Sequence, residues 1–280
     1  MNVFLIGDIH EGAANHDEEA FRAAVELIRR TKKEEPATYC VGMGDYTDCI
    51  IGQSDPRWDP IEVAEKYNIH DLKDLPRKQM EYFMRTIEPI RDTFVAYLTG
   101  NHEESYTRHH SFDVYGYLCG QNPDAHKLGY VGMLRFTVTL KGKPLGSVDF
   151  ALNHGAGGGG FREGYPVNKC YDVFRNSLAD VYAMGHIHKL AAEPDRIKSI
   201  DHTGFGLAWR KEWHCLTGCF LRSTVEGSRG YFEHKPGKES DIGMLRVRFR
   251  IRKRGHGGKR WVKEIEVEKI YLDEGARAVA

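Results

Sequence analysis

The chain has 280 residues, of which 41% are hydrophobic and 29% charged, and these values are typical of a globular protein that can bury a sizeable core. Lys and Arg together number 40, as do Asp and Glu, so the net charge excludes a long-range attraction to nucleic acid or to an anionic membrane, and any such preference must come from local patches. The six cysteines are scattered, which excludes a dense disulfide scaffold and favours reduced thiols. No stretch of the chain is long and apolar enough to predict a membrane span.

The chain begins with a short apolar run, Asn2–Gly7, which has no preceding basic segment and is too short for a signal peptide. We therefore expect an intracellular protein without membrane association. Its location would be the cytoplasm, or the host cytoplasm if a virus or phage encodes it. The oligomeric state does not follow from the sequence.

Asn2–Gly7 is also the first of five short runs that predict buried strands, the others being Thr38–Gly44, Phe94–Gly100, Val148–Asn153 and Asp180–Gly185. The spacing of apolar residues predicts helices between them, over roughly His16–Lys33, Arg77–Arg91 and Lys169–Leu178. This alternation favours a layered α/β protein. From about His202, apolar and charged residues alternate, which predicts antiparallel strands. No linker separates this β-rich part (202–280), so we expect one domain over residues 1–280.

Each of the five predicted strands is followed by side chains that can bind a metal ion. Loops at one end of a sheet commonly supply such groups, because the strands aim them toward one place. The carboxylate, amide and imidazole groups exceed what one ion needs and suit two divalent ions such as Mn, Fe or Zn. The candidate ligands are Asp8, His10, Asp45, Asn101, His154, His186 and His188.

The spacing of these residues fits a pair of ions. In an extended chain His186 and His188 point to the same side, about 6–7 Å apart at Cα, which is enough to straddle ions separated by about 3.5–4 Å. Asp45 is the natural bridging group because a carboxylate has two oxygens. A Gly before each cluster allows a tight turn and a close approach of metal or phosphate.

The motifs Asp8-x-His10, Gly44-Asp45-x-x-Asp48, Gly100-Asn101-His102-Glu103, His154-Gly155 and Gly185-His186-x-His188 occur in one order across residues 8–188. In this order they resemble the calcineurin-like metallophosphoesterase superfamily. The resemblance implies a four-layer αββα sandwich of two mixed β-sheets flanked by helices. It also implies hydrolysis of phosphate esters by a hydroxide that bridges two metal ions, for which we favour Mn²⁺, with Fe, Zn, Ni or Co as alternatives.

The resemblance further assigns roles to single residues. Asp8, His10, Asp45 and His188 would hold the first metal, and Asp45, Asn101, His154 and His186 the second. His102 would be catalytic: it would protonate the leaving oxygen or contact the phosphoryl group, and Asp48 would hydrogen-bond it. Glu103 would support the turn. Asn101, His102 and Arg108 are candidates for substrate binding, although Arg108 also fits a solvated helix start.

Three functions are compatible with these motifs. A phosphatase acting on phosphomonoesters is favoured by His10 and the Asn-His-Glu triplet, and its substrate would be a phosphorylated small molecule or nucleotide. A phosphodiesterase or nuclease, with nucleotides or nucleic acid as substrate, is the alternative. The third is a non-catalytic metal-binding scaffold module, against which the presence of His102 and Asp48 argues. Cys49 stands where the Ser/Thr phosphatase-like branch has a phosphate-binding Arg, which argues against protein phosphatase activity.

Three other segments invite functional interpretations. Gly155–Gly160 follows His154 and fits a substrate-side lid and a flexible loop equally well. Cys215 and Cys219, beside His214, fit small core residues better than a zinc site. Arg246–Arg260 is rich in basic residues, but the segment that follows offers Glu264, Glu266 and Glu268 to pair with it. A solvated face is therefore favoured over a nucleic-acid contact.

Overall fold

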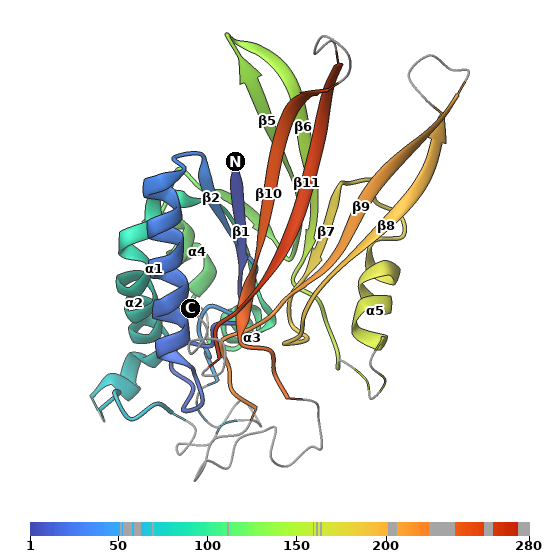
Figure 1. Cartoon of the computed structure of the whole chain (residues 1–280). Coiled ribbons are helices and arrows are strands. Elements are labelled where there is room, and N and C mark those ends of the chain that lie inside the picture. Colours follow the sequence, from blue (N-terminus) through green and yellow to red (C-terminus); the bar gives the residue numbers. More distant parts are fainter. Residues whose placement is uncertain are drawn as a thin grey trace.

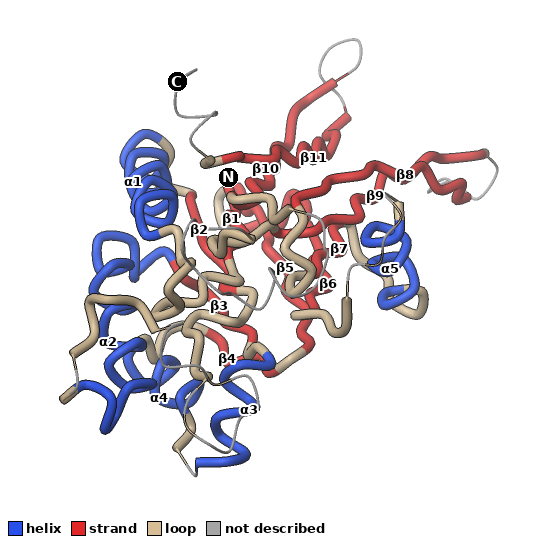
Figure 2. The backbone as a smooth tube through the Cα atoms, turned by 90° about the horizontal axis from the view of Figure 1, so that it is seen from below, coloured by secondary structure: helices blue, strands red, loops and turns tan. Residues whose placement is uncertain are grey.

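The computed structural model describes residues 1–50, 52, 58, 63–68, 70–110, 112–158, 160, 162, 164–200, 206–223, 239–254 and 260–273. Two mixed β-sheets pack face to face and helices cover their outer faces (Figure 1). Seen from below, α1, α2 and α4 lie on one side of the sheets and α5 on the other (Figure 2). The αββα layering predicted from the sequence motifs is thereby confirmed.

The first sheet has the strand order β11-β10-β1-β2-β3-β4. β1, β2, β3 and β4 run parallel, whereas β10 is antiparallel to both β1 and β11. The bounds are β1 (Asn2–Ile6), β2 (Thr38–Gly42), β3 (Phe94–Leu98), β4 (His126–Gly129), β10 (Gly243–Arg254) and β11 (Arg260–Tyr271).

The second sheet has the order β5-β6-β7-β9-β8. β6, β7 and β9 run parallel, and the edge strands β5 and β8 are antiparallel to their neighbours. The bounds are β5 (Val131–Leu140), β6 (Lys143–Asn153), β7 (Val181–Met184), β8 (Leu190–Ile200) and β9 (Leu207–Thr217). β9 lies beside β7 in the second sheet and β10 lies beside β1 in the first, so the C-terminal strands contribute to both sheets.

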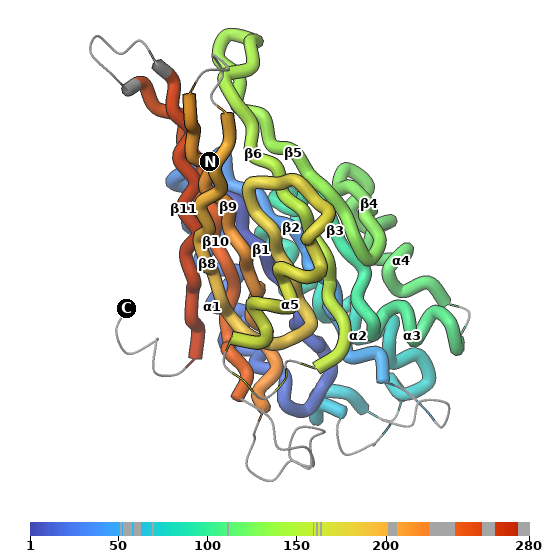
Figure 3. The backbone as a smooth tube through the Cα atoms, turned by 90° about the vertical axis from the view of Figure 1, so that its right-hand side faces the viewer, coloured from blue at the N-terminus to red at the C-terminus, as the bar shows by residue number. Residues whose placement is uncertain are grey.

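Three apolar clusters hold the layers together. Alternation along β1 sends Val3 and Leu5 into the cluster between the sheets and Phe4 and Ile6 into the cluster beneath the helices. α5 covers the outer face of the second sheet through a third, smaller cluster, and it lies in front of that sheet in Figure 3. Because β1 is covered on both faces, all five of its residues are buried.

The helices differ from their predicted bounds for local reasons. α1 (Glu18–Glu34) begins after Asp17, whose side chain accepts the N–H of Ala20 as an N-cap. α2 (Leu75–Ile87) stops short of the predicted Arg91 because Pro89 cannot continue an α-helix, and the 3₁₀-helix η3 (Glu88–Thr93) follows. α5 (Tyr165–Phe174) starts earlier than predicted, with Pro166 in its first turn.

Several elements were not predicted. A short 3₁₀-helix, η2 (Asp71–Asp74), precedes α2, and α3 (Asn101–His110) and α4 (Val114–Gln121) follow β3. Of these, α3 matters most for the site, because it begins at a predicted ligand. Within the described residues, no helix is both long and apolar enough to cross a membrane.

The pairing predicted for the Arg-rich segment is confirmed. β10 and β11 form a hairpin in which Arg246 lies opposite Glu268, Arg248 opposite Glu266 and Arg250 opposite Glu264. The Arg246 Nε atom is 2.8 Å from Glu268 Oε2. Residues 255–259 of this segment lie outside the described residues.

The interpretation of Cys215 and Cys219 as core residues is also confirmed. Both thiols are buried and free, and Cys219 lies just beyond the end of β9 rather than within it. His214 stacks between Tyr171 and Tyr182, with ring centroids 3.6 and 4.7 Å away, so its ring packs against aromatic side chains.

Candidate metal centre

The predicted ligands gather at one edge of the sandwich, where β1, β2, β3, β6 and β7 end. Since β1 to β3 are parallel in one sheet and β6 and β7 in the other, their carboxyl ends meet on the same side. Each of the seven residues lies within four positions of the end of a strand. The structure therefore brings together all seven residues that the motifs singled out as candidate ligands.

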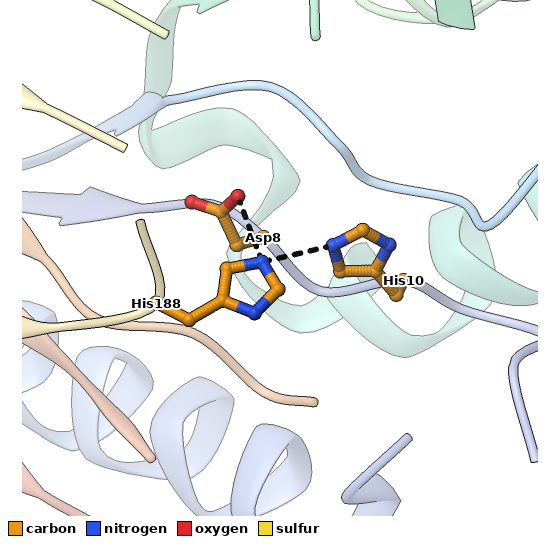
Figure 4. Close-up of side chains that lie close together, drawn as sticks. All are labelled: Asp8, His10 and His188. Carbon is orange, nitrogen blue, oxygen red and sulfur yellow. Dashed lines mark hydrogen bonds and ion pairs between the residues drawn. The ribbon is translucent and has the colours of Figure 1, made fainter. Parts of the chain in front are cut away.

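Asp8, His10 and His188 form a first group, whose ligand atoms lie within 4.8 Å of one another (Figure 4). The Nε2 atoms of His10 and His188 are 3.3 Å apart, and His188 Nε2 is 3.5 Å from Asp8 Oδ1. The fully buried Asp8 carboxylate accepts the backbone N–H of His186, with 2.9 Å between the nitrogen and Oδ2. One oxygen and two nitrogen atoms thus converge on a single point.

Asp45, His154 and His186 form a second group with the same 4.8 Å limit. His154 Nε2 is 3.2 Å from Asp45 Oδ2 and 3.1 Å from Asn101 Oδ1. Asn101 is the first residue of α3, and His154 and Asp45 are both buried. The amide oxygen of Asn101 therefore lies beside this group.

One carboxylate oxygen lies between the two groups. Asp45 Oδ2, which is 3.2 Å from His154 of the second group, is also 3.8 Å from the Nε2 atom of His10 in the first. The other oxygen, Oδ1, accepts the backbone N–H of His102 at 3.0 Å, which fixes the orientation of the carboxylate. Asp45 is accordingly placed where a bridging ligand would have to be.

Five of the seven residues have a left-handed backbone. The angle φ is 50° at Asp8, His10 and Asp45, 66° at His186 and 55° at His188. This conformation costs about 1–2 kcal/mol for an L-residue, and such strain gathers at functional sites. The prediction that His186 and His188 lie in an extended chain and point to the same side was therefore wrong. They lie beyond the end of β7 and reach different groups because the backbone turns at each of them.

Steric crowding explains why glycine occupies two positions beside the candidate ligands. A Cβ atom at Gly100 would lie 2.0 Å from Asp45 Oδ1, and one at Gly44 would lie 2.6 Å from His154 Nδ1. Gly44 also has a φ of 93°, which side chains rarely allow. These positions therefore leave room for the ligand side chains themselves, in addition to any substrate.

The histidines of the site have pKa values shifted in opposite directions. Burial lowers the pKa of His10, and it lowers the pKa of His186 to about 4, so both rings are neutral at neutral pH. Burial also opposes a charge on His154, but the Asp45 and Asp8 carboxylates raise its pKa to about 10. Its Nδ1 atom is 2.8 Å from the carbonyl oxygen of Met43, which leaves Nε2 directed at Asp45. The acidic field that raises this pKa would equally attract a metal ion.

The donor set fits divalent ions. Atoms bound to one ion at about 2.0–2.2 Å lie about 3.0–3.5 Å from each other at tetrahedral or octahedral angles. The contacts of 3.3 Å between His10 and His188, 3.1 Å between His154 and Asn101, and 3.2 Å between His154 and Asp45 match this spacing. Imidazole, carboxylate and amide groups together suit Mn, Fe or Zn.

His102 lies in the first turn of α3, beside both groups. Its Nε2 atom is 4.0 Å from Asp45 Oδ2, and its ring centroid is 4.5 Å from that of His10. The predicted hydrogen bond to Asp48 differs in detail: Nδ1 bonds the backbone carbonyl of Asp48, while the Asp48 Oδ1 atom is 3.7 Å away. Asp48 Oδ1 is also 3.8 Å from His10 Nδ1, so this carboxylate lies between the two rings.

Glu103 joins the loop after β2 to the start of α3, as its predicted supporting role requires. The buried carboxylate accepts backbone N–H groups from Asp45, Tyr46, Thr47 and Gly100 at 2.7–3.2 Å. Burial and the nearby Asp45 carboxylate raise the pKa of Glu103 to about 7. Glu103 thus holds the backbone from which Asp45 projects.

We expect Glu103→Gln to destabilise the metal-free protein by about 2–4 kcal/mol. Its amide group would leave two of the four N–H donors without an acceptor, at about 1–3 kcal/mol each. The measurement is urea unfolding at about pH 8, above the pKa of about 7, so that the wild-type carboxylate is ionised. Glu104→Gln, at the neighbouring half-buried position, is the matched control. Equal stability of the two variants would contradict the role of Glu103.

Two further candidates lie at the margin of the site. Arg108 is exposed in the last turn of α3, and its contact with substrate stays a prediction. In the Gly155–Gly160 segment, Gly155 follows His154 and its carbonyl oxygen accepts a hydrogen bond from the Tyr130 hydroxyl group. Gly159 lies outside the described residues, so the lid also stays a prediction.

A buried network behind His10 was not predicted from the sequence. Glu11 is buried and accepts a hydrogen bond from the Tyr67 hydroxyl group at 2.9 Å. Lys66 Nζ is 2.6 Å from Glu11 Oε1, and His16 Nε2 is 3.5 Å from Oε2. The one signal for Glu11 was its position next to His10, because its partners Lys66 and Tyr67 come from residues far along the chain.

Comparison with known proteins gives one family match. The model of the calcineurin-like phosphoesterase family matches residues 1–190, a range that includes all seven predicted ligands. No curated protein matches the chain.

The chain is similar to several solved structures at low identity. With GAP50, the anchor in the inner membrane complex of Plasmodium, the identity is 13%, the coverage is 98% of this chain and 85% of the other, and the TM-score is 0.47. For the calcineurin-like phosphoesterase YfkN from Bacillus subtilis the values are 13%, 96%, 90% and 0.37. For a conserved uncharacterized protein from Streptococcus pneumoniae TIGR4, a predicted phosphoesterase, they are 10%, 97%, 89% and 0.34.

Proposed function

The chain belongs to the calcineurin-like phosphoesterase family, whose members hydrolyse phosphate esters with divalent metal ions, and on this basis we propose that it is a phosphatase that cleaves phosphomonoesters at a dinuclear site. The substrate would be a phosphorylated small molecule or a nucleotide. The two ions would be Mn²⁺, which accepts the mixed oxygen and nitrogen ligands found here.

The position of Asp45 carries the proposal of two ions. The first would be held by Asp8, His10 and His188 and the second by Asn101, His154 and His186, with Asp45 shared between them. The two sets are separate clusters, and Asp45 Oδ2 lies 3.2 Å from His154 of one and 3.8 Å from His10 of the other, which supports two ions with a shared carboxylate. When bound, the ions would neutralise charge on the phosphoryl oxygens and make water acidic enough to supply a nucleophile at neutral pH.

The chain's own residues would orient the substrate and move one proton. His102 Nδ1 is held by the carbonyl oxygen of Asp48, which makes Nδ1 the donor of that bond. Nε2 is then the nitrogen that can hold a proton for the leaving oxygen, as in general acid catalysis. The Asn101 side chain, which lies beside His154, is placed to orient the phosphoryl group.

The preference for monoesters is supported by the environment of His10 and by the Arg-rich strand. His10 lies 4.5 Å from His102 between ring centroids, so both imidazoles line the same side of the site. The Arg side chains of β10 that would have favoured a nucleic-acid substrate contact Glu268 and Glu264 of β11 instead. They are thus largely neutralised.

The test is hydrolysis of p-nitrophenyl phosphate beside bis-p-nitrophenyl phosphate. The protein is stripped of metal, assayed, and assayed again after reloading with Mn²⁺, with His102→Ala as the control for contaminating activity. We expect turnover that requires metal and favours the monoester. A preference for the diester would replace the proposal with a phosphodiesterase or nuclease. Bound metal without turnover of either ester would support a non-catalytic module.

A further inference from the structure

Two β-hairpins, β8–β9 and β10–β11, project from the sandwich at the end opposite α3 (Figure 1). β8 starts at Leu190, two residues after His188, and ends at Ile200. At about 3.3 Å per residue, its far end is about 30 Å from the metal centre. The outer parts of these hairpins are therefore not needed for phosphate ester hydrolysis.

The strand register defines which side chains share a face. Near the base, Ala192 and Trp213 of β8–β9 and Phe249 and Ile265 of β10–β11 belong to the cluster between the two sheets. Because side chains alternate along a strand, the same face farther out carries a different set. We call this set the inner hairpin face. Its charged and aromatic members are Arg196, Lys198, Trp209, Lys211, Lys253 and Trp261, and the exposed Ile200 and Leu207 share it at the far end of β8–β9.

The inner hairpin face is exposed, basic and aromatic. Trp209 is 59% exposed and Trp261 41% exposed, which is unusual for side chains of this size. Lys198 lies over the Trp209 ring with its Nζ atom 5.5 Å from the centroid, and Lys253 lies over Trp261 at 4.9 Å. On each hairpin a lysine side chain therefore lies over an exposed tryptophan ring.

Acidic residues of the two hairpins are confined to one face. In β8, β9, β10 and β11 every acidic residue is on the opposite face: Glu193, Asp195, Glu212, Glu264, Glu266 and Glu268. Lys263, on the inner side, bonds Asp180 at the sheet edge, 2.6 Å away, and is neutralised there. Within the described part of the chain, Lys198, Lys211 and Lys253 form no ion pair. A protein with no net charge thus concentrates positive charge on one exposed face.

We propose that the inner hairpin face binds single-stranded nucleic acid. Lysine and arginine side chains would contact the phosphates, and Trp209 and Trp261 would stack on unpaired bases, a combination typical of sequence-tolerant single-strand binding. A second copy of this chain is a poorer occupant, because a symmetric contact would bring like charges together. The inference does not depend on the proposed phosphatase activity, since the face contains none of the ligand residues.

Binding can be measured with the metal-free full chain, in which hydrolysis of the probe is prevented. The probe is a fluorescent oligothymidylate of about 20 nucleotides, longer than a site of about 4–16 nucleotides, and the readout is fluorescence anisotropy. We expect affinity to fall steeply between about 50 and 200 mM salt. We also expect quenching of tryptophan fluorescence, because stacked bases would cover the two exposed indoles.

Matched variants locate the contact. Trp209→Ala is expected to weaken binding by about 5- to 150-fold, the loss of one stacked base. Lys198→Ala with Lys211→Ala should weaken binding and lower the salt dependence. The control is Arg250→Ala with Arg252→Ala, which removes the same charge from the opposite face of the neighbouring hairpin, and which should leave binding nearly unchanged.

Several results would overturn the proposal. No binding by the wild-type protein at about 50 mM salt would do so. So would equal losses in the inner-face and control variants, since that would indicate attraction by charge alone. Self-association that Trp209→Ala abolishes would assign the face to a second copy of the chain. Binding to anionic phospholipid vesicles in preference to the oligonucleotide would assign it to a membrane surface.

Discussion

Replacing His102 with Ala is expected to lower kcat for p-nitrophenyl phosphate by about 10²–10⁴-fold, the range for loss of a general acid. His102 lies with His10 and Asp48 in a further group of possible metal-binding side chains, but the proposed assignment gives it no metal, so both ions should remain. The two readouts are steady-state kinetics and metal content measured on the same protein sample. Turnover at the wild-type rate would refute the assignment of His102 as the proton donor.

A structural effect of this substitution must be separated from a catalytic one. A substrate with a much better leaving group needs less protonation of the departing oxygen, so the difference between wild type and His102→Ala should shrink for such a phosphate ester. A misplaced ligand would instead slow all esters by the same factor and reduce metal content. Asp48 offers a second check, because its carbonyl oxygen, rather than its carboxylate, bonds His102. Asp48→Asn should therefore affect kcat less than His102→Ala.

Replacing Asp45 with Asn is expected to weaken the binding of both metal ions by at least about tenfold. Mutating a residue that only hydrogen-bonds a metal ligand already lowers metal affinity by about 10–100-fold. Asn keeps the shape of the side chain but removes the charge shared by the two groups. Metal content after dialysis against Mn²⁺ gives the stoichiometry directly. Thermal unfolding gives a second measure, because ions that bind only the folded state raise the midpoint of unfolding.

The control is the variant Asp149→Asn, because Asp149 is an aspartate that pairs with Arg135 on the surface of the second sheet. This variant should bind two ions and show the full rise in the midpoint of thermal unfolding. Two ions per chain in Asp45→Asn, at undiminished affinity, would remove the argument for a bridging carboxylate. Loss of one ion with the other unchanged would place Asp45 in a single site and would likewise contradict sharing.

Much of the candidate site could be predicted because each ligand follows a strand. A short apolar run that ends in Gly reveals a strand end from local sequence, and parallel strand ends meet at one edge. Asp8, Asp45 and His154 were found in this way. The Arg–Glu pairing of β10 and β11 could be predicted for a similar reason, because two adjacent strands joined by a Gly-rich segment pair in register.

The helix that begins at Asn101 could not be predicted in this way. Asn101–His110 has few apolar residues, so it lacks the periodic pattern that reveals an amphipathic helix. Its first turn is tied to the loop after β2, because Glu103 accepts N–H groups from that loop, a contact between segments more than 50 positions apart. Glu11 escaped notice for the same reason, since its partners Lys66 and Tyr67 are equally distant along the chain.

The sequence by itself determined the class of chemistry and the candidate metal ligands, because side-chain type and position after a strand are local properties. Only the tertiary structure decided how the ligands are divided. It placed His186 and His188 in different groups through left-handed backbone angles, and it brought Asp45 Oδ2 between them. It also decided that Lys198, Trp209, Lys253 and Trp261 share one face. Such properties depend on strand register and on contacts between distant segments, which local sequence does not specify.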